Sequence, residues 1–282
     1  MTDDATFLSS KSTIAVLGCG WLGLPLARTL VEAGYRVHGS TTTPGQLLTL
    51  RDAGIRPFLL SLAPNLSVID ADTLQALLHG AEVLVLNVPP SRAAGRPDAY
   101  PALLQPVAQA ATRAGVQHVL LVSSTGVYAD EPRIMREADA QAAATAKAPL
   151  LQAEALFQAS QHTVVRLAGL IGPGRAPGRF LAGRAGVPHG EAPVNLIHLQ
   201  DCINLLTSII ERKLWGYTFN ASAATHPTRR TFYTAAATRL GLQPPTFLEE
   251  STGGKQIDSS LIRELTGYQF RHEDVVAALE YC

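Results

Sequence analysis

The chain has 282 residues, 46% of them hydrophobic, enough to bury an α/β core in one large or two coupled domains. Its 23 basic residues balance its 23 acidic ones, so nothing favours nucleic acid or an anionic membrane surface as a partner. No CxxC or metal-ligand spacing links Cys19, Cys202 and Cys282, which indicates neither a disulfide framework nor a metal site. The opening residues, MTDDATFLSSK, do not resemble a signal peptide, and no apolar run reaches membrane-spanning length. We therefore expect a soluble, cytoplasmic protein.

Residues 13–40 predict a buried strand, a glycine-rich turn, an amphipathic helix and a second strand. The turn carries Gly18, Gly20 and Gly23 in GxGxxG spacing. In dinucleotide-binding units the first glycine permits the tight turn, the second lets the backbone approach a diphosphate, and the third lets helix and strand pack closely. The backbone amides of Trp21 and Leu22 would then hold the phosphates at the helix N-terminus. Methyltransferases use a similar turn, but with GxGxG spacing, and position 22 here is Leu.

The end of the second strand predicts which nucleotide is bound. NAD-binding units usually carry an acidic residue here for the ribose, but residues 37–43 contain no carboxylate. The hydroxyls of Ser40, Thr41 and Thr42 can hydrogen-bond a 2′-phosphate. The sequence therefore favours NADP. NAD stays the alternative, because the arginine often found beside a 2′-phosphate is missing too.

Strand and helix patterns continue to alternate after the turn. We predict helices at residues 44–53, 71–79 and 100–114, and strands at 56–60, 82–86 and 119–122. Asn87, Val88 and Pro89 follow the fourth strand and Ser123 the fifth, where a cofactor would lie at the carboxyl edge of the sheet. This alternation predicts a parallel, doubly wound sheet with right-handed crossovers.

The rest of the chain predicts a helix at residues 138–160, interrupted near Pro149, and a sixth strand at 163–167. A Gly/Pro-rich loop at 169–193 contains Arg175, Arg179 and Arg184, which could clamp an anion or do nothing specific. Strands at 194–198, 216–220 and 255–258, helices at 199–211 and 228–240, and short final helices follow. We expect residues 1–170 to form a dinucleotide-binding domain and 171–282 a smaller, dependent substrate lobe.

Five ordered segments resemble the extended short-chain dehydrogenase/reductases, the NAD-dependent epimerase/dehydratase superfamily. They are the glycine turn, VLLVSSTGVYAD, VVRLAGLIGPGR, VNLIHLQD and KQIDSSLIRELTGY. GCGWLGLPLA, GSTTT and RLAGLIGPGR are most similar to an atypical branch, the YeeZ-like oxidoreductases. The resemblance implies an α/β, Rossmann-like doubly wound sheet with a small C-terminal α/β lobe. It also implies a homodimer through the fourth and fifth helices. Leu170 is the last of the predicted cofactor contacts.

The resemblance further implies a catalytic serine after the fifth strand, where Ser124 stands, and a tyrosine with a lysine four residues later. None of the seven tyrosines has Lys at that spacing, and Ala146 and Leu150 fall at the two places when Glu154 is aligned. A tyrosine needs a nearby cation to transfer a proton at neutral pH, so the usual acid–base mechanism does not carry over. Tyr128 is a candidate replacement, although a structural role is more common for it.

Other residues have both a functional and a structural interpretation. Lys147 could reach the nicotinamide ribose or simply be solvated, and His198, with Asp201 in the following helix, is better explained as a core histidine. The sequence thus predicts an NAD(P)-dependent oxidoreductase acting on a small molecule, with Ser124 polarising a carbonyl or imine, or with epimerase-like chemistry. An inactive NADP(H)-binding sensor or scaffold is the alternative, and a lyase or isomerase a weaker one.

Overall fold

The computed structural model describes residues 11–90, 99–157, 161–249 and 253–282. The N-terminal decapeptide and the last three residues of the helix predicted at 138–160 lie outside these ranges. Contacts group the chain into two compact units, Met1–Val88 with Ala102–Leu120, and Pro89–Pro101 with Leu121–Cys282. The predicted boundary at residue 170 stays a proposal about where the substrate lobe begins.

A seven-stranded parallel sheet forms the centre of the fold, in the order β10-β7-β5-β4-β1-β2-β3. This confirms the predicted doubly wound α/β fold. The reversal of strand order beside β1 is the topological switch point at which such folds bind ligands. The strands are β1 (Lys11–Leu17), β2 (Tyr35–Thr41), β3 (Arg56–Leu59), β4 (Ala81–Leu86), β5 (His118–Ser124), β7 (Gln161–Leu167) and β10 (Thr218–Ala221).

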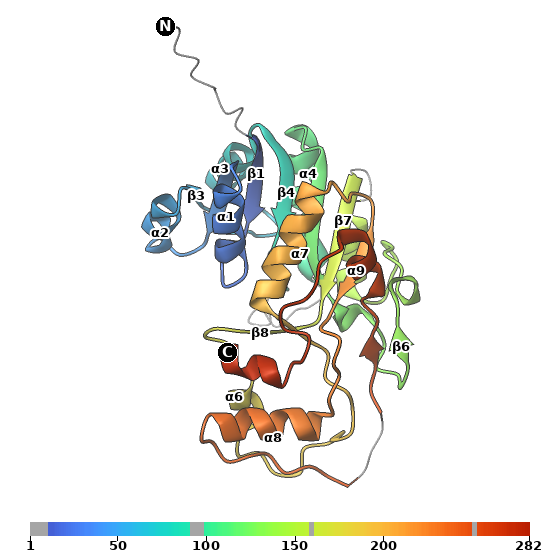
Figure 1. Ribbon diagram of the computed structural model, residues 1–282. Helices are drawn as coiled ribbons and strands as arrows, with labels where there is room; N and C mark the ends of the chain where they lie inside the picture. Colours follow the sequence, from blue (N-terminus) through green and yellow to red (C-terminus); the bar gives the residue numbers. More distant parts are fainter. Residues whose placement is uncertain (1–10, 91–98, 158–160, 250–252) are drawn as a thin grey trace, which may run out of the picture. The chain divides into compact units, whose positions relative to one another are not determined.

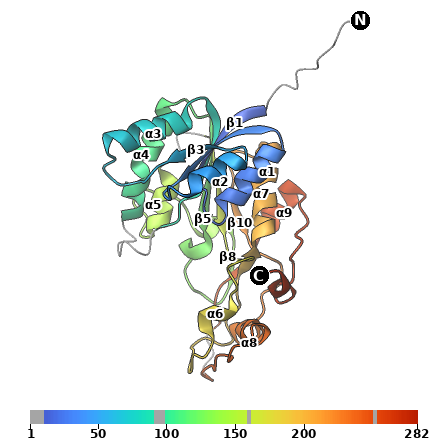
Figure 2. The same cartoon turned by 90° about the vertical axis from the view of Figure 1, so that its left-hand side faces the viewer.

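The first unit surrounds β1, whose residues Ile14–Leu17 are fully or almost fully buried, as expected of a strand covered on both faces. Figure 2 shows α1 and α2 on one face of the sheet and α3 and α4 on the other. Leu26, Ala27 and Leu30 form the buried face of α1. The four helices are α1 (Gly23–Glu32), α2 (Gln46–Asp52), α3 (Val68–Leu78) and α4 (Tyr100–Arg113).

The second unit contains two small parallel sheets, in which β6 pairs with β11 and β8 with β9. Figure 1 shows α6 and α8 lying side by side. The strands are β6 (Ile134–Met135), β8 (Gly169–Ile171), β9 (Leu196–His198) and β11 (Gln256–Ile257). The helices are α5 (Pro149–Ala155), α6 (Gly178–Leu181), α7 (Leu199–Glu211), α8 (Arg229–Arg239) and α9 (Ser260–Thr266), with 3₁₀ turns at Thr125–Val127, Glu137–Asp139 and Ala277–Tyr281.

The helix predicted at residues 138–160 is wrong for most of its length. Among the described residues of this range, the α-helix spans Pro149–Ala155 and a 3₁₀ turn ends at Asp139. Ala148 before the proline is extended, as the proline ring requires. Upstream, the carbonyls of Glu137 and Ala140 accept hydrogen bonds from the Arg166 guanidinium at 3.1 and 2.9 Å, and the Glu137 carbonyl also accepts from the Ala140 amide at 3.5 Å. The segment 169–193 was predicted as a loop throughout, but it contains the strand β8 and the helix α6.

Among the described residues, no helix has the length and apolar character that a membrane span requires. The His, Cys, Asp and Glu side chains of the same residues form no group of three or more arranged to hold a metal ion.

Candidate functional site

The glycine turn between β1 and α1 is held by the two neighbouring strands. Gly18 has a φ of +102°, a conformation that side chains disfavour. Its amide donates to the Ser40 hydroxyl at 3.0 Å, and its carbonyl accepts from the Asn87 side chain at 3.0 Å. The Cys19 amide donates to the Ser40 carbonyl at 2.8 Å. The turn is therefore fixed from β2 on one side and from the end of β4 on the other.

Close packing around the turn requires two of its three glycines. A Cβ atom at Gly18 would lie 2.4 Å from the Asn87 carbonyl oxygen, and one at Gly23 would lie 2.1 Å from the Gly18 carbonyl oxygen. Apart from its two chain neighbours, no described residue has an atom within 4 Å of the place where a Cβ of Gly20 would be. Local packing thus explains why positions 18 and 23 are glycines, but it does not explain why position 20 is one.

The N-terminus of α1 has no side-chain cap among the described residues, and Leu22 occupies the N-cap position in helical conformation. The first-turn amides and the helix dipole together favour an anion at this end. That the amides of Trp21 and Leu22 hold the phosphates stays a prediction.

The residues predicted to bind the 2′-phosphate differ in exposure. Ser40 and Thr41 are buried, and the Thr41 hydroxyl donates to Gln46 at 2.8 Å while accepting from the Thr43 amide. Thr42 is exposed. Ser40 thus holds the glycine turn, and Thr42 is the member of this group that faces solvent.

Cys19, inside the turn, is a packing residue. Burial raises the pKa of its thiol to about 12, against the effect of a hydrogen bond with the Ser40 backbone. A Cβ at Gly39 would lie 2.8 Å from its sulfur. A buried, protonated thiol is not a nucleophile.

In the second unit, Ser124 ends β5 and caps the short 3₁₀ turn that follows it. Its hydroxyl oxygen accepts from the Gly126 amide at 3.0 Å, and the side chain is half-buried. A serine hydroxyl has one donor and two acceptor sites. With the amide on one lone pair, the Ser124 proton remains available to a substrate oxygen or nitrogen.

Tyr128 belongs to a buried polar network built around Arg166. The guanidinium donates to the Tyr128 hydroxyl at 2.8 Å and to both oxygens of Glu154 at 3.1 and 2.8 Å. The Tyr128 hydroxyl donates to Asn220 at 2.6 Å, and Ser123 donates to Glu154 at 2.6 Å. Burial raises the pKa of Tyr128, and the positive charge of Arg166 opposes this.

This network favours a structural role for Tyr128 and Ser123, because each hydroxyl is already committed to a buried partner. Arg166 and Asn220 were not among the predicted site residues. The available signal was Arg166 itself, a charged residue in the apolar run VVRL, since a buried charge must be paired.

The remaining candidates have different surroundings. Val88 lies beside the glycine turn, since a Cβ at Gly18 would lie 3.5 Å from its side chain. Pro89 is exposed, and Leu170 is in β8, paired with Ile197 of β9. Arg175, Arg179 and Arg184 are exposed.

His198 is a core residue, in agreement with the interpretation favoured from the sequence. It is the N-cap of α7, where Nδ1 accepts from the Gln200 amide at 3.2 Å and Nε2 contacts the Tyr281 carbonyl at 3.2 Å. Asp201 is fully buried and accepts from the Tyr268 hydroxyl and two backbone amides. Both side chains hold the C-terminal segment in place.

Comparisons with known proteins agree with this geometry. A family model described as NAD(P)H-binding matches residues 18–196. Protein YeeZ of Escherichia coli K12 is 36% identical over 267 residues, which cover 93% of this chain and 96% of YeeZ.

Solved structures show the same fold. A proposed NAD-dependent epimerase/dehydratase from Methylobacillus flagellatus is 25% identical, with a TM-score of 0.68 over 94% of this chain and 95% of that one. UDP-glucuronic acid 4-epimerase from Bacillus cereus, solved with NAD, is 17% identical, with a TM-score of 0.75 over 95% and 96% of the two chains. The chain therefore belongs to the NAD(P)H-binding family, in the YeeZ-like branch of the NAD-dependent epimerase/dehydratase superfamily.

Proposed function

We propose that this chain is an NADP(H)-dependent oxidoreductase that passes a hydride between nicotinamide and a small molecule, by carbonyl or imine reduction or by epimerase-like transient oxidation. The observation that carries the proposal is the glycine turn, fixed by Ser40 and Asn87 and followed by a helix without a side-chain cap. The residues present fit a dinucleotide, since the amides after Gly20 can donate to a diphosphate. Bound there, the cofactor would supply the hydride chemistry.

Ser124 is the residue to which we assign substrate polarisation. Its hydroxyl oxygen accepts from the Gly126 amide, and its proton can be donated to a carbonyl oxygen or an imine nitrogen. A donor aimed at developing charge is a strong contribution to catalysis. Imines need weaker acid assistance than ketones because their nitrogen is already basic, so the lack of a Tyr-Lys pair favours an imine substrate over a ketone.

The choice of NADP over NAD rests on the end of β2. Residues 40–43 carry four hydroxyls and no carboxylate that would repel a 2′-phosphate. Of the three residues predicted to bind the phosphate, Thr42 is the exposed one, and we assign it to the phosphate. We further propose that the protein is a cytoplasmic homodimer. The lobe of residues 171–282 would hold the small substrate, and Tyr128 stays the second catalytic candidate.

A specific observation supports the alternative, a cofactor-binding sensor without turnover. Ala146 and Leu150, at the aligned places of the missing tyrosine and lysine, pack against the apolar cluster of Val127, Tyr128, Met135, Leu151 and Ile257. No ionisable group stands at either place.

Two measurements test the proposal. NADPH and NADH titrations, followed by quenching of Trp21 fluorescence, should give saturable binding that is tighter for NADPH; no binding of either would overturn the cofactor assignment. A panel of aldehydes, ketones and imines should then oxidise NADPH, and Ser124→Ala should lower kcat by about 10²-fold while leaving NADPH binding unchanged. NADPH binding without turnover on any class would favour the sensor.

A further inference from the structure

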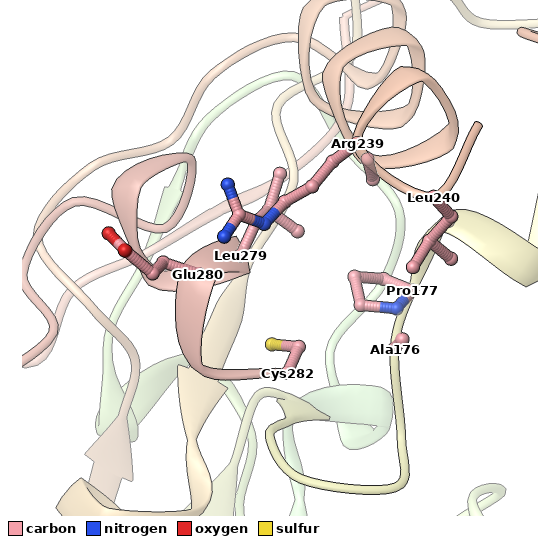
Figure 3. A pocket seen from close by; sticks show the side chains of 9 residues that line it. Ala176, Pro177, Arg239, Leu240, Leu279, Glu280 and Cys282 are labelled. Carbon is pink, nitrogen blue, oxygen red and sulfur yellow. The ribbon is translucent and has the colours of Figure 1, made fainter.

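A cavity of about 420 Å³ lies in the second unit, and neither Ser124 nor a member of the Arg166 network lines it. Three segments surround it: the start of α6, the end of α8 and the C-terminal residues (Figure 3). Its size is within the range of small-molecule sites. The lining residues are Ala176, Pro177, Gly178, Ala236, Arg239, Leu240, Leu279, Glu280 and Cys282.

One wall of the cavity is rigid. A Cβ at Gly178 would lie 2.2 Å from the Ala236 carbonyl oxygen, so α6 and α8 approach each other backbone to backbone. Ala236 and Leu279 are buried. The cavity is thus formed by packed elements, and a ligand would meet a preformed wall.

Arg239, in the last turn of α8, supplies the positive charge. It is exposed and makes no ion pair or hydrogen bond with the described residues. Figure 3 shows its side chain extending from α8 toward the C-terminal segment, while the Glu280 carboxylate points away from Cys282 and Pro177. An uncommitted guanidinium beside a cavity offers a planar set of donors that matches carboxylate and phosphate oxygens.

Cys282 lines the same cavity. Its thiol is half-buried and donates to the Ala278 carbonyl at 3.4 Å. Burial raises its pKa, and a hydrogen bond with the Gly172 backbone and then the charge of Arg239 oppose this. Arg239 also lines the cavity. Cys19 and Cys202 are fully buried.

We infer that this cavity binds a small organic anion whose carboxylate or phosphate group is held by Arg239. The site goes beyond the proposed function, because it needs neither nicotinamide nor Ser124. It also differs from the anion clamp that the sequence left open as one of two interpretations, since Arg175, Arg179 and Arg184 are not among the lining residues.

Alkylation of Cys282 by the neutral reagent iodoacetamide tests the inference, with Cys19 and Cys202 as unreactive internal references. Malonate should slow the reaction saturably, by about tenfold at ten times its Kd, and its neutral analogue malonamide should not. Inorganic phosphate at the same ionic strength distinguishes the two anion types, and protection by either supports the site. Equal protection by malonate and malonamide, or none by either anion, would overturn it.

Three variants sharpen the test. Arg239→Gln should abolish protection and lower the ratio of iodoacetate to iodoacetamide rates about threefold, since it removes the field that attracts the anionic reagent. Glu280→Gln should lower the malonate concentration needed for half-protection. The control, Arg184→Gln, removes an exposed arginine outside the cavity and should change neither quantity.

Folding and cofactor binding are measured in parallel. Arg239→Gln should unfold at the wild-type temperature and keep wild-type NADPH affinity, so loss of the anion site is distinguishable from loss of the cofactor site. Should Arg239→Gln not fold, the comparison of malonate with malonamide on the wild-type protein and the Glu280→Gln variant still decide the outcome.

Discussion

Each of the three positions in the turn is a glycine for a different physical reason. Gly18 supplies a positive φ, and Gly23 leaves room for the Gly18 carbonyl 2.1 Å from where its Cβ would be. Gly20 satisfies neither need, because its Cβ position is open. We propose that Gly20 lacks a side chain because the diphosphate of the cofactor approaches the backbone there.

Gly20→Ala therefore separates binding from folding. The new methyl group lies more than 4 Å from every described residue other than its two chain neighbours, so thermal stability should stay at the wild-type value. The methyl would occupy the space of the diphosphate, and NADPH affinity should fall by at least about tenfold. Calorimetric titration and a thermal melt of the same sample measure both quantities.

Gly45→Ala is the matched control, because that Cβ position is also open and its φ is −63°. It should leave both stability and NADPH affinity unchanged. If Gly20→Ala bound NADPH as tightly as Gly45→Ala does, the diphosphate would not pass over Gly20.

At the scale of elements, the Arg166–Glu154 pair joins α5 to β7. The two side chains are 2% and 1% exposed, and the guanidinium also binds the carbonyls of residues 137 and 140. A buried ion pair does not by itself stabilise a fold much, but removing one partner leaves an unpaired charge in a dry environment. The network therefore fixes the course of residues 137–155.

Glu154→Gln should destabilise the protein by about 3–5 kcal/mol, because Arg166 loses its counter-charge while remaining buried. Chemical denaturation gives the free energy of unfolding. The control is Glu191→Gln, which breaks the Arg230–Glu191 pair, 39% and 45% exposed, and should cost less than about 1 kcal/mol. Equal effects of the two substitutions would contradict the buried role of Glu154.

For the molecule as a whole, three partly or fully buried imidazoles link stability to pH. Burial lowers the pKa of His38, His198 and His226 below the usual 6.5, and backbone hydrogen bonds oppose this. Above that value both folded and unfolded states are neutral at these sites. Below it the unfolded chain binds protons that the folded chain does not, so stability falls as the pH falls toward the folded-state values.

We expect the free energy of unfolding to decrease from pH 7.5 to pH 5.5, a range in which most carboxylates stay ionised. His198→Asn, which can keep the N-cap of α7 but cannot titrate, should show a shallower decrease. Denaturant titrations at constant ionic strength measure both slopes. A wild-type protein that is as stable at pH 5.5 as at pH 7.5 would contradict the lowered pKa values.

The sequence by itself determined the alternation of strands and helices, the glycine turn and the superfamily. These follow from short-range patterns: apolar runs that make buried strands, helical spacing as in Leu26 and Leu30, and glycines at fixed offsets. Helix α7 was predicted at Leu199–Glu211 to the residue. Local periodicity suffices there because the same residues both form the element and bury its face.

Tertiary structure decided what depends on residues far apart in the chain. The alanine-rich stretch before Pro149 has high helix propensity, yet Arg166 takes the carbonyls of Glu137 and Ala140. Ser40 was predicted from its hydroxyl alone, and only the packing of β1 against β2 shows that its oxygen holds Gly18. Arg239 and Cys282 line one cavity although 43 positions separate them. Pairings of this kind depend on which strands and helices become neighbours, and no local pattern encodes that.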